Sequence, residues 1–216
     1  MIDATGSMAD EIAKIQDTIF DVAARIDALP GQPNVRYGMV TYRDRGDSFV
    51  TRPYEFTPDV RDFHANLSTV QADGGGDTPE SLNEALHDAL HRVEWRGDDT
   101  VQLIFLVADA PPHLDYPQDY DYAVEMAVAA NRGIKIFPIA SSGLDDQGEY
   151  IYRQIAQFTQ GRFIFLTYEG PTNGGAPGEV TTHHVEDYSV NNLDDLLVKL
   201  VEEGLAYQTP QLMQAQ

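Results

Sequence analysis

The stretch VQLIFLVAD, residues 101–109, is nearly all apolar and ends in a carboxylate. An uninterrupted apolar run of this length is typical of a strand that is buried on both faces of a parallel sheet. The Asp at its tip needs a partner, because an ionised carboxylate is costly to bury alone. The stretch therefore predicts a central strand with a polar feature at its carboxyl end.

Helices and strands alternate on both sides of this stretch. We expect helices over residues 7–29, 57–70, 78–95, 119–132, 149–160 and 191–206, and further strands over 35–44, 48–56, 133–141 and 162–166. The first two of these strands form a predicted hairpin, and Pro53 places the second at an edge of the sheet. This order predicts an α/β fold: a doubly wound, mostly parallel, Rossmann-like sheet with one antiparallel edge strand and helices on both faces.

We expect residues 1–206 to form one domain and residues 207–216 a C-terminal tail. The segment EGPTNGGAPGE, residues 169–179, has the Gly and Pro density of an exposed, mobile loop. Only Met1 and Ile2 precede a segment that sits where a first central strand should end. Because two residues make a very short central strand, we expect a truncated first strand, with further sequence before Met1. A native short start with another segment in the gap is the alternative.

The composition narrows the classes of partner and site. With 14 basic and 35 acidic side chains, the formal charge is −21, so a cation or a basic protein surface is favoured and nucleic acid is not expected. The absence of Cys excludes thiol catalysis, disulfides and Cys-ligated zinc. The sequence has neither a recognisable signal peptide nor the run of about 20 apolar residues that a membrane span needs. A secreted, periplasmic or cell-surface location is favoured, because an export signal could have preceded Met1.

Three oxygen-bearing side chains alternate near the start of the chain. In DATGS, Asp3, Thr5 and Ser7 stand two residues apart, and Gly6 allows a sharp turn. Residues two apart in extended backbone point the same way, so these side chains can present three oxygens to one point. The helix that follows directs free N–H groups toward the same place. Capping of that helix by Ser7 is the simpler alternative.

Two further loops should reach the same edge of the sheet, because ligands bind where the carboxyl ends of parallel strands meet. GGGDTPES, residues 74–81, brings Asp77 and Thr78 to a helix start, and VADAPPH, residues 107–113, brings Asp109. For Asp77, N-capping is again the alternative. Hydroxyl and carboxylate oxygens together suit a hard divalent cation, with Mg²⁺ favoured and Ca²⁺ or Mn²⁺ as alternatives. The candidate metal ligands are Asp3, Thr5, Ser7, Asp77, Thr78 and Asp109.

In this order the three loops resemble those of the von Willebrand factor A domain family. The metal-ion-dependent adhesion site of that family reads Asp-x-Ser-x-Ser on the first loop, Thr or Asp on the second and Asp on the third. Asp3-Ala4-Thr5-Gly6-Ser7 matches the first loop with Thr in place of Ser, and Asp109 matches the third. On the second loop we favour Asp77 over the adjacent Thr78. The resemblance covers the chain apart from the first strand, and it implies bound Mg²⁺ and a role in binding another protein.

The number of carboxylates modifies what the resemblance implies. In the adhesion members, hydroxyls bind the metal directly and carboxylates act partly through water, so the cation attracts an acidic partner. Asp3, Asp77 and Asp109 around a 2+ ion would leave a formal charge of about −1, which weakens that attraction. The metal would then serve structure as much as ligand capture. With Thr78 as the ligand instead, the adhesive role regains force.

These observations predict a non-enzymatic, divalent-metal-dependent module for adhesion or assembly, as bacterial members of the family often are. An unidentified protein partner would dock over Mg²⁺ at the carboxyl edge of the sheet. One alternative is a Mg²⁺-dependent hydrolase of the haloacid dehalogenase type with Asp3 as nucleophile, although that chemistry needs a second Asp where Thr5 stands. A purely structural domain of a larger multidomain protein is another. A dinucleotide-binding enzyme would need G-x-G-x-x-G after the first strand, where the sequence reads ATGSMAD.

Two other patterns have simpler explanations. Arg45-Gly46-Asp47 spells the tripeptide that some integrins recognise, but a hairpin turn uses Gly and Asp in any case. His183 and His184 are adjacent, and neighbouring side chains of an extended stretch point to opposite faces. We therefore expect neither an integrin ligand nor a metal shared by these two histidines.

Overall fold

The computed structural model describes residues 1–76, 78–97, 99–141, 143–166, 188–189 and 193–214. Its strands are β1 (Ile2–Asp3), β2 (Tyr37–Tyr42), β3 (Thr51–Thr57), β4 (Leu103–Ala108), β5 (Lys135–Ala140), β6 (Ile164–Leu166) and β7 (Tyr188–Ser189). They form one sheet in the order β3-β2-β1-β4-β5-β6-β7. All neighbours pair in parallel except β2 and β3. The predicted fold class is thus confirmed, whereas the short strand β7 was not predicted.

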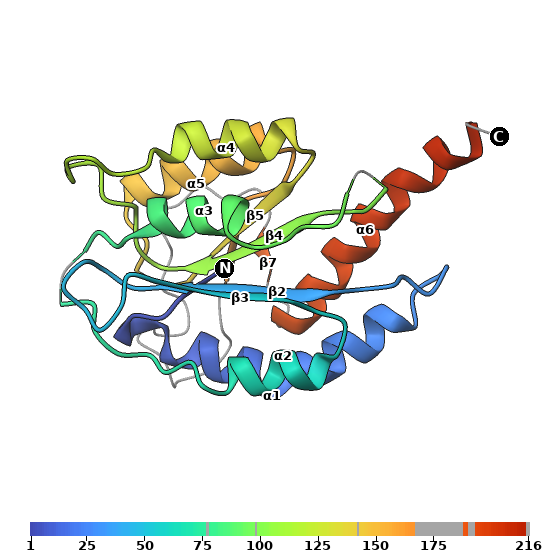
Figure 1. The fold of residues 1–216 in the computed structure, drawn as a ribbon, viewed down its shortest axis with the longest axis horizontal. Helices are drawn as coiled ribbons and strands as arrows, with labels where there is room; N and C mark the ends of the chain where they lie inside the picture. The colour runs from blue at the N-terminus through green and yellow to red at the C-terminus, as the bar shows by residue number, and fades with distance from the viewer. Residues whose placement is uncertain (77, 98, 142, 167–187, 190–192, 215–216) are drawn as a thin grey trace.

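The helices cover both faces of the sheet (Figure 1). They are η1 (Gly6–Met8, a 3₁₀ turn), α1 (Ala9–Asp27), α2 (Val60–Leu67), α3 (Leu82–His91), α4 (Tyr122–Asn131), α5 (Asp146–Phe158) and α6 (Leu193–Gln214). One core lies between the sheet and α3, α4 and α5, and a second lies between the sheet and α1, α2 and α6. The layers are therefore helix, sheet and helix.

The hairpin and the edge position follow from the sequence as expected. Pro53 of β3 lies opposite Val40 of β2, and β3 is the last strand on its side of the sheet. Pro lacks an N–H, so an edge strand loses least by holding it. β4, which forms from the apolar stretch 101–109, lies between β1 and β5 in the interior of the sheet.

β1 is short, as predicted, and it occupies the centre of the sheet. Ile2 pairs with Thr41 of β2 on one side and with Val107 of β4 on the other. Backbone bonds continue the pairing beyond the strand, from the Met1 nitrogen to the Phe105 carbonyl (2.6 Å) and from the Ala4 nitrogen to the Tyr42 carbonyl (2.8 Å). These added bonds explain how a two-residue strand holds a central place.

The helix boundaries differ from the prediction, most clearly at α3, which also ends earlier, at His91, and at α6. The first residues of the predicted helix 78–95 are not helical, because Glu80 forms a parallel bridge with Pro112 and α3 begins only at Leu82. α6 continues past residue 206 to Gln214. The division into a domain of residues 1–206 and a tail stays a prediction. The predicted loop 169–179 lies outside the described residues.

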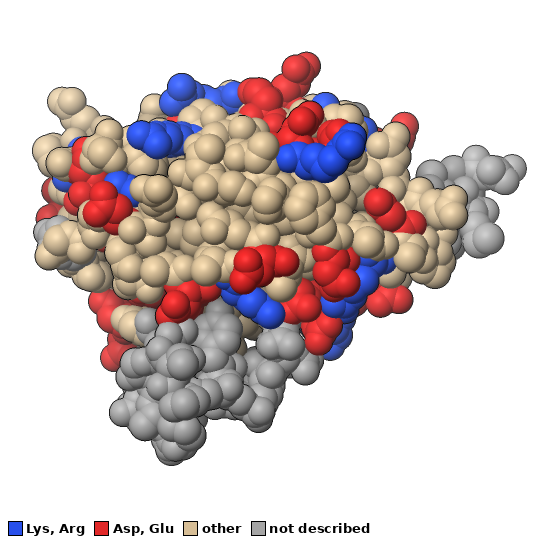
Figure 2. All heavy atoms as spheres, turned by 90° about the horizontal axis from the view of Figure 1, so that it is seen from below, with Lys and Arg blue, Asp and Glu red and all other residues tan. Residues whose placement is uncertain are grey.

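Among the helices in the described ranges, none combines the length and apolarity required to cross a bilayer. Seen from below α1 and α2, Lys and Arg side chains lie beside Asp and Glu side chains over the described surface of that face (Figure 2). Positive charge is interspersed there with negative charge and is not gathered into one area.

Candidate metal centre at the carboxyl edge of the sheet

The first loop holds its three oxygen side chains close together. The Thr5 backbone N–H and hydroxyl both donate to Asp3 Oδ1, at 2.9 and 2.7 Å, and Thr5 Oγ1 lies 3.4 Å from Ser7 Oγ. Neither η1 nor α1 has a side-chain hydrogen bond at its N-cap. These side chains therefore do not cap the helix, and the capping alternative is wrong.

Asp3 is fully buried, and its two oxygens differ. Oδ1 accepts the bonds from Thr5, whereas Oδ2 has no hydrogen-bond partner among the described residues. Burial raises the pKa of Asp3 to about 7, against the effect of the Thr5 hydrogen bonds, and the nearby charge of Asp109 raises it further. A buried carboxylate oxygen without a partner is destabilising unless a cation meets it.

The second loop packs directly against the first. The Gly6 N–H donates to the Gly74 carbonyl (3.2 Å), and the Gly75 backbone has φ +69°. A Cβ at Gly75 would lie 2.7 Å from Thr5 Cβ and 2.9 Å from Glu80 Oε1, so no larger residue fits without displacement. Gly is required at this position by both backbone conformation and space.

The second loop also carries two predicted ligands. Asp77 lies outside the described residues. Thr78 is exposed and precedes Pro79 through a cis peptide bond. The choice between Asp77 and Thr78 stays a prediction.

Asp109 follows β4 and arrives beside the first loop. It is half-buried. Burial raises its pKa, and a hydrogen bond with the Ser7 side chain partly offsets that increase. The third loop is tied to the second, because the Glu80 N–H donates to the Pro111 carbonyl (3.0 Å) and the His113 N–H donates to the Glu80 carbonyl (3.1 Å). The structure thus brings Asp3, Thr5, Ser7 and Asp109 to one place.

Two further buried carboxylates surround this place and were not predicted. Glu80 has a pKa raised to about 9, chiefly by burial and then by the charges of Asp3 and Asp44, and its Oε2 lacks a partner among the described residues. Glu11 of α1 is also buried, which raises its pKa, and Asp109 adds to the increase. In the sequence Glu80 and Glu11 are ordinary helix-start acids, so only the packing shows that they line the same edge.

The tripeptide Arg45-Gly46-Asp47 is engaged within the chain. The Arg45 guanidinium forms ion pairs with Glu84 and Asp119, and Asp47 accepts a hydrogen bond from the Gly75 N–H (3.1 Å). These contacts agree with the hairpin-turn interpretation. His183 and His184 lie outside the described residues.

Oxygen donors converge here, and they fit a hard divalent cation. Asp3 Oδ2 is buried and has no partner among the described residues, Asp109 lies close enough to raise the Asp3 pKa, and the hydroxyls of Thr5 and Ser7 bond to these two acids. Mg²⁺ and Ca²⁺ are bound in proteins by such carboxylate and hydroxyl oxygens.

Comparison of the sequence with known families agrees with the loop arrangement. A model of the von Willebrand factor A domain matches residues 1–168. The chain belongs to the von Willebrand factor A domain family. Domains of this family generally mediate protein–protein interactions.

Relatives of this von Willebrand factor A domain are longer proteins. Over 182 residues it is 25% identical to a putative ariadne-like RING finger protein of Acanthamoeba polyphaga mimivirus, covering 77% of this chain and 18% of that protein. Over 114 residues it is 35% identical to von Willebrand factor A domain-containing protein 7 of Rattus norvegicus, covering 52% of this chain and 11% of that protein. The chain therefore spans less than a fifth of either relative.

A solved structure has the same fold. It is an aerotolerance-related membrane protein from Bacteroides fragilis, crystallised with multiple mutations to serine. The TM-score is 0.56 at 14% identity, and the match covers 95% of this chain and 96% of the other. At this identity the likeness concerns the fold alone.

Proposed function

We propose that this von Willebrand factor A domain is a Mg²⁺-dependent protein-binding module whose partner docks over the metal at the carboxyl edge of the sheet. Asp3, Ser7 and Asp109 would hold the ion, Thr5 would orient Asp3, and Asp77 or Thr78 would complete the set. The observation that carries the proposal is the buried Oδ2 of Asp3, which lies beside Asp109 and has no hydrogen-bond partner in the part of the chain that the structure describes.

The bound ion would supply positive charge at the surface of an otherwise acidic site. Two carboxylates offset a 2+ ion, and a third would leave a charge of about −1 at the site. Burial, and then the charges of Asp3 and its acidic neighbours, raise the pKa of Glu80 to about 9, so without a bound cation its neutral form is favoured and it adds no charge near pH 7. We therefore expect weak attraction for an acidic partner group and a contribution of the metal to the order of the three loops.

Metal binding is tested by calorimetric titration of the full chain with MgCl₂. We expect saturable binding in the wild type and binding weaker by about 100-fold or more in Asp109→Ala, with unchanged far-UV circular dichroism. Ser7→Ala, which removes a hydroxyl and keeps both carboxylates, should bind more weakly than wild type but measurably. Unchanged affinity in Asp109→Ala would contradict the site.

Partner docking is tested with a synthetic probe. A short peptide with a central Glu and its Gln counterpart are titrated into the Mg²⁺-loaded chain and into the chain in EDTA. Binding that requires both Glu and Mg²⁺ supports docking over the metal. If neither peptide binds while Mg²⁺ does, the metal is structural, as the carboxylate count allows.

The hydrolase alternative has a direct assay. In this site the Thr5 hydroxyl donates to Asp3 Oδ1 at 2.7 Å, so the position two residues after Asp3 holds a hydrogen-bond donor and not a carboxylic acid. Turnover of a chromogenic phosphate ester with Mg²⁺, lost in Asp3→Asn, would replace the binding proposal with an enzymatic one.

A further inference from the structure

A second group of side chains of the types that bind metals lies between α3 and α4. His87 and His91 stand four residues apart on α3, and Glu125 projects from α4. His87 Nδ1 lies 2.9 Å from Glu125 Oε1, and His91 Nε2 lies 2.9 Å from Glu125 Oε2. The three ligand atoms all lie within 4.8 Å of one another.

The environment of Glu125 calls for positive charge. Its side chain is only 6% exposed, and its two carboxylate oxygens each face a histidine nitrogen. Two neutral histidines would offer hydrogen bonds but no charge to balance the carboxylate. The two rings stack with centroids 4.4 Å apart, so both present a nitrogen to the same carboxylate. One divalent cation at the meeting point would balance the carboxylate and bind both ring nitrogens.

The geometry points to a binding site for Zn²⁺, or a similar imidazole-preferring divalent metal, formed by His87, His91 and Glu125. Zinc bonds to N and O ligands are about 2.0–2.1 Å, which places tetrahedral ligands about 3.4 Å apart. The donor atoms lie within 4.8 Å of one another, so small side-chain rotations bring them to that spacing. Each ring nitrogen that faces Glu125 gives up its proton to solvent or to the other nitrogen of its ring, and its lone pair then binds the metal.

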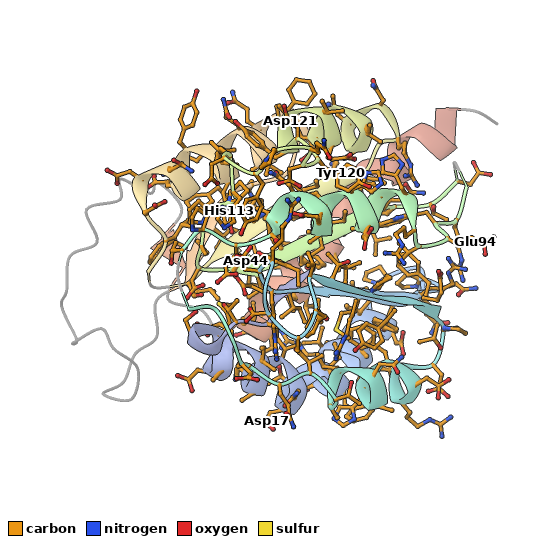
Figure 3. The ribbon with its side chains drawn as sticks, turned by 60° about the vertical axis from the view of Figure 1, so that its left-hand side comes forward. Asp17, Asp44, Glu94, His113, Tyr120 and Asp121 are labelled. Carbon is orange, nitrogen blue, oxygen red and sulfur yellow. The ribbon has the colours of Figure 1, made fainter. Side chains whose placement is uncertain are left out.

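The helices hold the three side chains in place. Residues four apart lie on the same face of a helix, so His87 and His91 point together toward α4. Tyr120, just before α4, stacks on the His87 ring with a centroid distance of 3.6 Å and an interplanar angle of 5°, and lies beside α3 and α4 in Figure 3. The His91 side chain is 39% exposed, so solvent reaches the site and can supply the fourth ligand.

This site differs from the carboxyl edge in its donors and is independent of the proposed function. Neutral imidazole selects zinc and related transition metals, whereas all-oxygen sites suit Mg²⁺ or Ca²⁺. A metal here would cross-link α3 to α4. It would stabilise the fold in proportion to its occupancy, since it binds the native arrangement of ligands.

The test is a titration of the full chain with ZnCl₂ in excess MgCl₂, which keeps the carboxyl edge occupied. We expect one zinc per chain, a rise in Tm, and the visible absorption of a tetrahedral site when Co²⁺ replaces zinc. His91→Gln and His87→Gln should each weaken zinc binding about 100-fold, because each removes a direct ligand. Both variants should lose the zinc-dependent rise in Tm.

Three controls decide the outcome. His64→Gln removes a histidine of α2 and should leave zinc affinity unchanged. Asp109→Ala should also bind zinc as the wild type does, which excludes zinc binding at the carboxyl edge. Glu125→Gln removes the carboxylate and tests its part in zinc binding. Circular dichroism confirms that this variant folds. Failure to bind zinc in the wild type, or equal affinity in wild type and both histidine variants, overturns the assignment and leaves a histidine–glutamate hydrogen-bond cluster.

Discussion

The carboxyl edge of the sheet and the contact between α3 and α4 each bury a carboxylate, but the surroundings of the two carboxylates differ. At the edge, Asp3 is met by hydroxyls and by other acids, and one of its oxygens has no partner in the described part of the chain. Between the helices, both oxygens of Glu125 meet imidazole nitrogens. Burial therefore raises the pKa values of Asp3 and Glu80 at the edge, whereas the helix pair brings polar partners to both oxygens of Glu125.

The difference shows how donor type and local rigidity would favour different metals at the two proposed sites. Loops joined by backbone bonds, such as Gly6 to Gly74, gather oxygens from distant parts of the chain. Two helices bring together two nitrogens from one turn of α3 and one carboxylate from α4. Oxygen sites suit hard cations and imidazole sites suit zinc, so one chain can present two sites that do not compete.

The largest expected effect is a loss of metal affinity at one site in a variant that keeps its affinity at the other site. Asp109→Ala should lose Mg²⁺ binding by about 100-fold or more while zinc affinity stays within twofold of wild type. His91→Gln should show the reverse. Parallel calorimetric titrations of both variants with both metals measure the four affinities, and a variant that weakens both metals equally would show that the regions are coupled.

Closure of the second loop on the first can be broken at one glycine. Gly75→Ala places a Cβ 2.7 Å from Thr5 Cβ in a backbone with φ +69°. We expect a loss of about 1–3 kcal/mol in the free energy of unfolding and weaker Mg²⁺ binding. In Gly76→Ala the new Cβ has no heavy atom of the described residues within 4 Å. Gly31→Ala places a Cβ in similarly open space, but on a backbone with φ +88°. Denaturant unfolding of the three variants separates crowding at the site from backbone strain.

The burial of Glu11 at this edge predicts that the stability of the fold depends on pH. Burial raises the Glu11 pKa in the folded chain above its usual 4.5, so the folded state favours the protonated form. This contribution to stability is present below the unfolded pKa and is lost as pH rises through the folded pKa. Glu11→Gln should thus exceed the wild type in stability near pH 8 by up to about 1 kcal/mol in EDTA, with the gain vanishing toward pH 4.

Urea unfolding at several pH values measures this difference. Asp10→Asn, at an exposed position of the same helix turn, is the matched control and should show no comparable pH-dependent gain. A Glu11→Gln gain that is constant from pH 4 to pH 8 would argue against a titrating carboxylate as its cause.

The smallest expected effect concerns the helix that carries Glu125. Asp121 caps α4 by accepting from the Ala123 N–H at 2.8 Å, and it lies at the helix start in Figure 3. Asp121→Ala should cost about 1 kcal/mol in stability, whereas Asp121→Asn keeps the acceptor and should cost less. Zinc affinity should fall slightly with Asp121→Ala and Mg²⁺ affinity should not, which calorimetry on the same two variants checks.

Much of the fold could be predicted from the sequence because its signals are local. The apolar run over residues 101–109 indicated the buried strand β4, and Pro53 indicated the edge. β7 has two residues, and a strand that short has no pattern to detect. The start of α3 was predicted too early, because the pairing of Glu80 with Pro112 is a long-range contact that prevents the helix from starting there.

The candidate sites divide in the same way. The order Asp3, Thr5, Ser7 is visible in the sequence, because alternation in extended backbone is local. His87 and His91 show the four-residue spacing of a helix face, a signal that could have been found within the predicted helix 78–95. Glu125 has no such signal, since its place beside the histidines depends on α4 packing against α3.

By itself, the sequence determined the α/β alternation, the edge strand and the three oxygen-bearing loops, because periodicity and turn chemistry act over a few residues. The tertiary structure alone decided that Asp3 keeps an unpartnered oxygen, that Glu80 and Glu11 join it, and that Glu125 meets two histidines. Burial and the charges of neighbours set these properties, and both depend on segments far apart in the chain.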